Sequence, residues 1–394
     1  MSDLRLLILS DLHAFERLGA SDAQPSYLRV SAPDISPGAH PVRGLLDLIA
    51  REGIRADVLV SPGDLGDRAE PAAIKYAWEK LHAIGSQVGA SLVVAASGNH
   101  DLDTRFHSSP FDTKAHLQSL TPPYPLPDRA LNNQYWADHY AVWRRDGYRL
   151  VVLNSCAFHA QAPQEIDHGR VSPYTLQRLA ADLESDPDCQ FNILLCHHHP
   201  QQQMELQLGE LDFMRNGQGL LDLLGSGRFG SWLVVHGHKH LPKLCYAAGG
   251  SSSATVLSAG SFSICLYGEL QTRARNQLHL VELVPTSNHC YSLAGRVRSW
   301  QWAAGDGWAR ATGNSGLPFE CGFGCRTSAR AVAGAIAKVA GGKKVAWKAV
   351  RAAVPDLEYL VPLDVTNLKL ILRTEFSLVA LEEDSVIVEL VPAS

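Results

Sequence analysis

Five short apolar segments along the chain each end in a group of polar residues. The segments begin near residues 4, 56, 91, 191 and 231, and all are rich in Leu, Val and Ile. Apolar runs of roughly four to eight residues are typical of strands that are buried on both faces. Between them lie segments with helical periodicity, over residues 42–52, 71–88, 172–185 and 217–225. This alternation of strands and helices predicts an α/β core.

The polar residues that follow the five segments are types that bind metal ions. Because ligands of α/β sheets bind beyond the carboxyl ends of the strands, we expect these residues to form one site. In extended backbone, residues i and i+2 point the same way, so two Asp-x-His or His-x-His pairs could each present two ligands to one place. The residues are Asp11, His13, Asp64, Asn99, His100, His197, His198, His199, His238 and His240.

The chemistry of this group favours two metal ions. If His100 is left aside and one histidine of the 197–199 run is counted, seven side chains offer oxygen or nitrogen atoms and none is a cysteine. Seven ligands are too many for one ion and suit two ions that share a bridging carboxylate. Mixed carboxylate and imidazole ligands favour Mn, Fe or Zn over Ca or Mg. Two such ions clamp the attacking and leaving oxygens of a displacement at phosphorus, and they make hydroxide available from bound water.

Five ordered motifs carry a resemblance to a known family. They are D-L-H at 11–13, G-D-L-G-D-R at 63–68, G-N-H-D at 98–101, H-H-P at 198–200 and G-H-K-H at 237–240. In order and placement they resemble the calcineurin-like metallophosphoesterase superfamily over about residues 4–284. The resemblance implies an α/β fold, in which two mixed β-sheets form a sandwich flanked by helices.

The resemblance also implies roles for individual residues. Asp11, His13 and His240 would hold one ion, Asp64 would bridge, and Asn99, His198 and His238 would hold the other. His198 is chosen because the family's histidine usually lies two residues before the proline, and His197 is the alternative. His100 would protonate the leaving oxygen or stabilise the phosphorane, and Asp67 would orient His100.

Composition and charge exclude several classes of protein and indicate a cellular compartment. The chain has 394 residues, 46% of them hydrophobic, and a net charge of −5, which excludes a disordered chain and a general polyanion binder. No apolar run approaches a membrane span, and the first residues do not suggest a signal peptide. Eight scattered cysteines show no disulfide pattern, so we expect a cytoplasmic protein with reduced thiols.

The character of the sequence changes near residue 286. We expect a metallophosphoesterase domain over 1–285, closed by antiparallel strands after residue 250, and a small C-terminal α+β accessory domain over 286–394. Within the latter, residues 321–355 contain seven basic residues and no acidic one. That segment could contact nucleic-acid phosphates, although a solvated helix face is the simpler interpretation.

The predicted function is hydrolysis of a phosphodiester, such as a cyclic nucleotide or another nucleotide-type substrate, by attack of a metal-bound hydroxide. The alternatives are a metal-dependent nuclease acting on DNA or RNA, and a phosphomonoesterase or protein phosphatase. A small phosphorylated substrate is favoured because two long proline-containing loops, over 14–41 and 102–134, could enclose it. The oligomeric state is left open.

Overall fold

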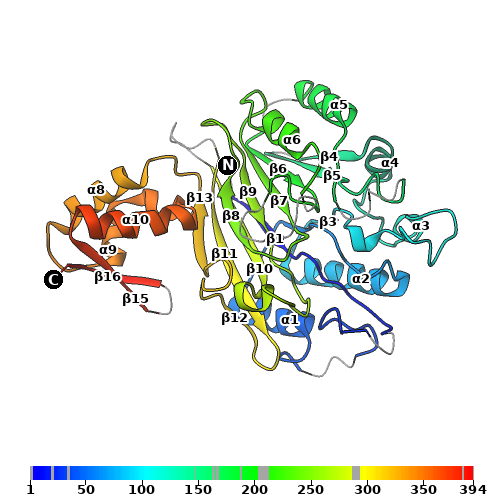
Figure 1. The fold of residues 1–394 in the computed structure, drawn as a ribbon, viewed down its shortest axis with the longest axis horizontal. Helices are drawn as coiled ribbons and strands as arrows, with labels where there is room; N and C mark the ends of the chain where they lie inside the picture. Colours follow the sequence, from blue (N-terminus) through cyan, green and yellow to red (C-terminus); the bar gives the residue numbers. More distant parts are fainter. Residues whose placement is uncertain are drawn as a thin grey trace.

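Two large β-sheets face each other, with helices on their outer sides and a smaller unit at one edge (Figure 1). Apolar side chains from both sheets, such as Ile8 and Val60 from one and Ile193 and Leu195 from the other, form one shared core. The α/β sandwich expected from the sequence is confirmed. The computed structural model describes residues 3–18, 22–32, 36–145, 147–161, 165, 168–186, 189–202, 213–285, 293–383 and 386–393.

The first large sheet is mixed. Its order is β12-β11-β10-β1-β2-β3, and β13 pairs with β11. β1, β2 and β3 are parallel, whereas β10 is antiparallel to β1. The strands are β1 (Leu4–Ile8), β2 (Val58–Ser61), β3 (Leu92–Ala95), β10 (Asn276–Val284), β11 (Ala294–Ala303), β12 (Gly307–Arg310) and β13 (Glu320–Phe323).

The second large sheet has the order β4-β5-β6-β7-β9-β8. Its four central strands are parallel, and β4 and β8 are antiparallel edges. Of the closing strands expected after residue 250, β10 is antiparallel to β1, and β9 is antiparallel to β8 but parallel to β7. Residues 262–269 form no strand. The strands are β4 (Tyr140–Arg145), β5 (Tyr148–Leu153), β6 (Phe191–Leu195), β7 (Trp232–His236), β8 (Lys243–Tyr246) and β9 (Thr255–Ser258).

The helices cover the outer faces of the sandwich. α1 (Pro41–Glu52) and α2 (Pro71–Val88) pack their apolar sides against the first sheet, and α5 (Pro173–Glu184) and α6 (Gly217–Leu224) against the second. These four helices match the predicted periodicity. In the described part of the chain, no helix has the length and apolarity needed to cross a membrane. The shorter helices are η1 (Asn99–Asp101), α3 (Ala115–Gln118), α4 (Arg129–Asp138) and α7 (Leu270–Arg273).

The first three strands after residue 286, which are β11, β12 and β13, belong to the first sheet. β11 pairs with β10 over nine residue pairs, from Asn276–Trp302 to Val284–Ala294. Trp300 and Trp302 of β11 and Trp308 of β12 are buried in the core beneath α1. The compact first unit therefore extends to about Phe323, beyond the boundary at 285/286 expected from the sequence. The change in sequence character near 286 marks a connection between two paired strands.

A small unit with its own apolar core follows β13. Its three-stranded sheet has the order β14-β16-β15, and its helices pack on one side of it, as the α+β expectation required. Arg326 joins it to β8, because its guanidinium lies 3.6 Å from the ring centre of Tyr246. The elements are α8 (Ala329–Ala340), β14 (Val345–Ala346), α9 (Trp347–Ala353), η3 (Pro355–Tyr359), α10 (Pro362–Glu375), β15 (Leu378–Glu383) and β16 (Val386–Pro392).

Two truncations test where the first unit ends. A chain ending at residue 285 loses β11–β13, which exposes one edge of β10 and removes three buried tryptophans from the core. We expect it to be insoluble or to lack a cooperative thermal transition. A chain ending at residue 327 keeps these strands and should unfold cooperatively, as measured by circular dichroism. A soluble, cooperatively folded 1–285 chain would contradict the longer unit.

Candidate metal centre

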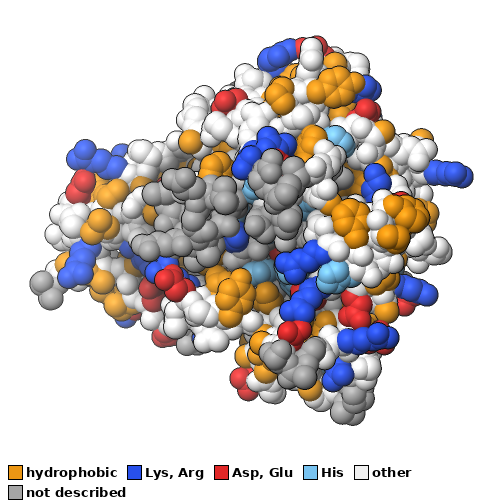
Figure 2. All heavy atoms as spheres, turned by 45° about the vertical axis from the view of Figure 1, so that its right-hand side comes forward, with side chains coloured by type: hydrophobic (Ala, Val, Ile, Leu, Met, Phe, Trp, Pro, Cys, Tyr) orange, Lys and Arg blue, Asp and Glu red, His pale blue; other side chains and the backbone are white. Residues whose placement is uncertain are grey.

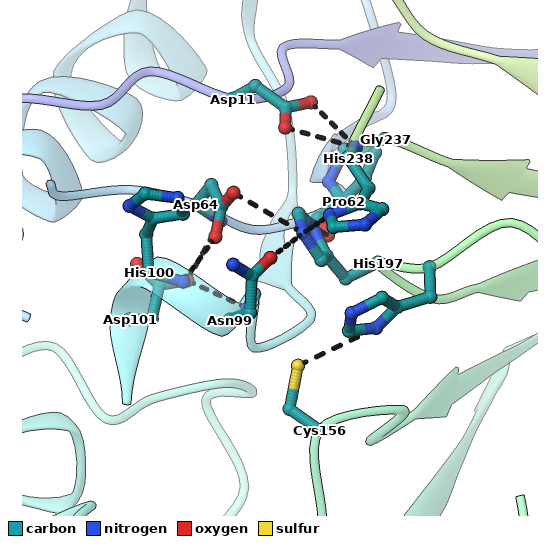
Figure 3. Close-up of polar contacts among 12 residues, drawn as sticks. Asp11, Pro62, Asp64, Asn99, His100, Asp101, Cys156, His197, Gly237 and His238 are labelled. Atoms are coloured by element: carbon teal, nitrogen blue, oxygen red, sulfur yellow. Dashed lines mark hydrogen bonds and ion pairs between the residues drawn. The ribbon is translucent and has the colours of Figure 1, made fainter. Parts of the chain in front are cut away.

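The five polar groups of the sequence meet at one end of the sandwich, and both sheets contribute to them. Asp11 and Asp64 follow β1 and β2 of the first sheet, and Asn99 begins η1 shortly after β3. His197 and His238 follow β6 and β7 of the second sheet. In Figure 3 these side chains point toward one another. The expected convergence at the carboxyl ends of the strands is present.

The carboxylate of Asp64 occupies the middle of the group. Its Oδ2 atom lies 3.4 Å from Nε2 of His13 and 3.3 Å from Nε2 of His197. Its Oδ1 atom accepts a hydrogen bond of 2.8 Å from the backbone nitrogen of His100. Although burial opposes ionisation, the charges of His197 and His100 hold the pKa of Asp64 well below its usual range. One carboxylate oxygen therefore faces donor atoms from both sides of the site.

His197 stands among three further donor residues. Its Nδ1 donates to the carbonyl oxygen of Pro62 at 3.0 Å, which directs Nε2 toward the site. That Nε2 atom lies 3.0 Å from Oδ1 of Asn99 and 3.2 Å from Nδ1 of His238. Donor atoms of Asp64, Asn99 and His197 thus converge. The carboxylate of Asp64 raises the pKa of His197 against burial, so a proton on Nε2 is favoured there, and a cation could take the place of that proton. Metal-binding histidines commonly donate the N–H of their other ring nitrogen to a carbonyl oxygen, which fixes the tautomer.

His198, which the motif spacing favoured, contacts the turn after β5. Its ring centroid also lies 4.4 Å from that of His238, and its donor atom lies within 4.8 Å of those of His197 and His238. Its Nδ1 lies 2.9 Å from Oγ of Ser155 and 3.8 Å from Sγ of Cys156. Neighbouring side chains at the end of a strand point to opposite sides, so only one of His197 and His198 can face Asp64 closely. The structure places His197 there, and the distance to the proline alone could not distinguish the two.

A second group of three side chains lies on the other side of Asp64. Asp11, His13 and His240 bring their donor atoms within 4.8 Å of one another. Oδ1 of Asp11 is 3.6 Å from Nδ1 of His240 and accepts a hydrogen bond of 3.0 Å from the backbone of His238. Burial raises the pKa of Asp11. A cation would offset the cost of holding this carboxylate away from water.

The backbone of these loops is strained at five of the residues concerned. Asp11, His13, Asp64, His238 and His240 have φ of 52°, 47°, 53°, 81° and 58°, in the left-handed region. The two i, i+2 pairs are therefore not extended, contrary to the expectation from the sequence. Their side chains reach a common place because tight turns redirect the chain. Such strain costs about 1–3 kcal/mol per residue and is concentrated at functional sites.

His100 lies beside the metal-binding groups and contacts the carboxylate expected to orient it. Its Nδ1 is 3.0 Å from Oδ1 of Asp67, and its ring meets that of His13 edge-on at 4.6 Å. Burial lowers the pKa of His100, but the charges of Asp64 and Asp67 outweigh burial and raise it to about 9. Asp67 also lies 3.6 Å from Nε of Arg68, which reaches Asp22.

Asp101 is an organising residue that sequence reasoning did not single out. Its carboxylate accepts hydrogen bonds of 2.7–3.2 Å from four backbone nitrogens. Burial and the charge of Asp64 raise its pKa to about 6. It thereby fixes the loop after β2 against the loop after β3. The sequence feature that could have identified Asp101 is its place as the last residue of the G-N-H-D motif. The nitrogens belong to Asp64, Leu65, Gly66 and Gly98.

Buried nitrogen atoms without hydrogen-bond partners provide a test of whether metal ions fit. Among the described residues, Nε2 of His13, Nε2 of His238 and Nδ1 of His240 are buried and have none. An unsatisfied buried polar atom costs about 1–3 kcal/mol. Together with the carboxylates of Asp11 and Asp64, these atoms form an oxygen and nitrogen donor set that divalent ions fit.

Comparison with known proteins gives a consistent picture. Residues 4–268 match the family model described as calcineurin-like phosphoesterase, and residues 321–374 match one described as wHTH-Calcineurin_assc. A cAMP/cGMP dual specificity phosphodiesterase of Mycobacterium tuberculosis (strain CDC 1551 / Oshkosh) is 30% identical over 156 residues. That match covers 40% of this chain and 41% of the relative. A purple acid phosphatase from yellow lupin (Lupinus luteus) seeds shares the fold, with a TM-score of 0.50 and 12% identity over 83% of this chain and 54% of its own.

Gly98 offers a test of how closely the loops must approach. A methyl group on it would overlap both Oδ1 and the backbone nitrogen of Asp64, whereas one on Gly250 would meet nothing within 4 Å. We expect Gly98→Ala to lower the free energy of unfolding by about 1–3 kcal/mol and to weaken metal retention. Gly250→Ala is the matched control and should change neither. Thermal melts and elemental analysis after dialysis would measure both effects, and unchanged metal content in Gly98→Ala would contradict the prediction.

Proposed function

The chain belongs to the calcineurin-like phosphoesterase family, and on this premise we propose that it hydrolyses a phosphodiester with the help of two divalent metal ions. The observation that supports two ions most directly is the position of Asp64. One of its oxygens faces His13 on one side and His197 on the other, at 3.4 and 3.3 Å. A carboxylate between two sets of nitrogen donors is the arrangement that a bridging ligand requires.

The residues around Asp64 divide into two ligand sets in this proposal. Asp11, His13 and His240 serve one ion, with Asp64 shared. The other ion is held by Asn99, His197 and His238. His197 takes the place that the motif spacing gave to His198, because its Nε2 faces Asp64 and Asn99 directly. When bound, the ions activate water and neutralise charge at the phosphorus, and Mn, Fe and Zn suit this donor set.

His100 is the proposed acid. Neighbouring carboxylates raise the pKa of His100 to about 9 in the protein without bound metal ions, so its imidazole is able to hold a proton near neutral pH. Asp67 accepts a hydrogen bond from the N–H group at Nδ1, so the proton on Nε2 is available for a leaving oxygen. Asp67 is a positioning residue, because it acts through the ring of His100. Its own pKa is lowered, against burial, by hydrogen bonds with His100 and His13, so it stays ionised.

A nucleotide-type diester is the favoured substrate class. Support comes from the 30% identical relative, whose name describes a cAMP and cGMP phosphodiesterase. Because the match spans less than half of either chain, this substrate is a proposal for the present protein. A phosphomonoesterase is the alternative for the same metal centre.

A nuclease is the second candidate, supported by the match of residues 321–374 to a model whose description includes wHTH. The charges of the C-terminal unit weaken it. Arg330, Lys344 and Arg351 pair with Glu375, Glu389 and Glu320, and Arg326 stacks on Tyr246. On the face drawn in Figure 2, Lys and Arg side chains are scattered among acidic and apolar ones. The exposed side of α10 carries Leu363 and Leu370.

Replacing the shared carboxylate tests the two-ion proposal. We expect Asp64→Ala to lose both ions on dialysis and to lose nearly all activity, whereas His197→Ala should lose one ion. The assay is metal stoichiometry by elemental analysis together with hydrolysis of bis-p-nitrophenyl phosphate and a cyclic nucleotide. Asp47→Ala, on the outer side of α1, is the control. Near-normal turnover of Asp64→Ala would rule out a bridging role.

Replacing His100 tests the acid. A ribose alkoxide is a poor leaving group that needs a proton, whereas nitrophenolate leaves without much help. We therefore expect His100→Asn to keep both ions and to lose roughly 10²–10⁴ in rate on a cyclic nucleotide, with a clearly smaller loss on nitrophenyl esters. Asp67→Asn should show a weaker form of the same pattern.

The outcomes of the His100 experiment separate three roles. Loss of metal in step with activity would make His100 a ligand. Equal loss of rate on both substrates, with the ions retained, would make it a stabiliser of phosphorane charge. Only unequal loss with intact metal content supports proton delivery.

A further inference from the structure

A second cluster of metal-binding side chains lies beside the two-metal centre, and two of its three members, Cys156 and His159, lie outside every motif of the sequence. Cys156, His159 and His198 each offer one donor atom, and these atoms lie within 4.8 Å of one another. Cys156 and His159 belong to the turns after β5, and His198 to the loop after β6. We propose that these three residues, the Cys156 cluster, bind a third divalent ion, and that this ion is zinc.

The cluster is closed to solvent. The side chains of Cys156 and His198 are fully buried, and His159 is 5% exposed. Sγ of Cys156 lies 3.8 Å from Nδ1 of His198, a contact that Figure 3 draws as a dashed line. The rings of His159 and His198 meet edge-on with centroids 5.4 Å apart. A buried group of protein ligands is typical of structural zinc sites.

One buried atom without a partner, on His159, points to a missing ligand at this place, whereas Sγ of Cys156 donates to the carbonyl oxygen of Ser97 at 3.2 Å. Nε2 of His159 donates to the carbonyl oxygen of His168 at 3.1 Å, so the lone pair of the neutral ring is on Nδ1. That Nδ1 atom is buried and, within the described chain, has no hydrogen-bond partner. The arrangement matches metal-binding histidines, whose other nitrogen is held by a carbonyl. Burial lowers the pKa of His159 to about 4, which keeps the ring neutral.

The donor types favour zinc over the ions of the neighbouring centre. The two-metal centre offers carboxylate, amide and imidazole atoms, whereas the Cys156 cluster adds a sulfur, which selects softer ions. Burial holds the pKa of the Cys156 thiol well above its usual range, so the thiol is protonated unless an ion is bound. On binding, the S–H bond is broken, the proton leaves to solvent and the sulfur electron pair forms the bond to zinc.

A third ion would connect two loops that the phosphoesterase site depends on. The turn carrying Cys156 and His159 is separated from His198 by about 40 residues of sequence, and the two meet because β5 and β6 are neighbouring parallel strands. His198 adjoins His197, whose Nε2 faces Asp64. The Cys156 cluster would therefore hold the loop that carries His197, without contacting substrate.

Cobalt(II) substitution tests this site in the full-length protein. A thiolate bound to Co(II) gives an intense near-ultraviolet charge-transfer band, and the two-metal centre has no cysteine to produce one. We expect the wild-type protein to bind three equivalents of Co(II) or Zn(II) and to show the band with Co(II). Cys156→Ser should lose the band and one equivalent, and His159→Asn should weaken binding at least tenfold at the same site. Cys325→Ser, another buried cysteine, should keep both.

Either of two results would overturn the proposal. Wild-type protein that takes up Co(II) without the band has no metal-bound thiolate, and this result needs no variant to fold. A band that persists in Cys156→Ser would come from another cysteine. Because the band reports the sulfur ligand directly, it answers the question whether or not the protein hydrolyses a phosphodiester, so failure here and failure of the proposed function are separable.

Discussion

The buried carboxylate of Asp64 is the interaction on which the site depends. It lies in the loop after β2 of the first sheet, yet one of its oxygens faces His197, which follows β6 of the second sheet. Its other oxygen and its backbone nitrogen are tied to the loop after β3, through His100 and Asp101. The arrangement of two facing sheets therefore has a direct chemical meaning. Sliding one sheet along the other would separate a negative charge from the nitrogen donors that make its burial tolerable.

The sequence predicted the first half of the molecule well because two independent signals agree there. Apolar runs located the buried strands, and the polar residues after them located the site, since parallel strands end at a common edge. The choice between His197 and His198 was beyond such reasoning, because it depends on which way the chain turns after Leu195. The left-handed conformations at Asp11 and His13 could not be predicted from the sequence either, because an Asp or a His does not by itself indicate a turn.

The C-terminal half of the chain shows a different limit of prediction from sequence. A change of composition near residue 286 suggested a new domain, but β10 and β11 on either side of it form one antiparallel pair. Pairing between strands depends on contacts distant in sequence, and composition carries little information about it. The Cys156 cluster illustrates the same point, because Cys156 and His198 become neighbours only through the pairing of β5 with β6.

The left-handed backbone at the proposed metal ligands restricts which residue types can stand at these positions. Asp, Asn and His tolerate positive φ better than most side chains, whereas β-branched residues do not. At Asp11, Asp64 and His240 the residue must therefore meet two requirements: it must supply a donor atom, and it must tolerate a positive φ. A glutamate would supply the same carboxylate as Asp64 but with a longer reach and a less tolerant backbone. Few residue types meet both requirements. A change of metal preference is therefore easier to achieve by substituting surrounding residues than by substituting the proposed ligands themselves.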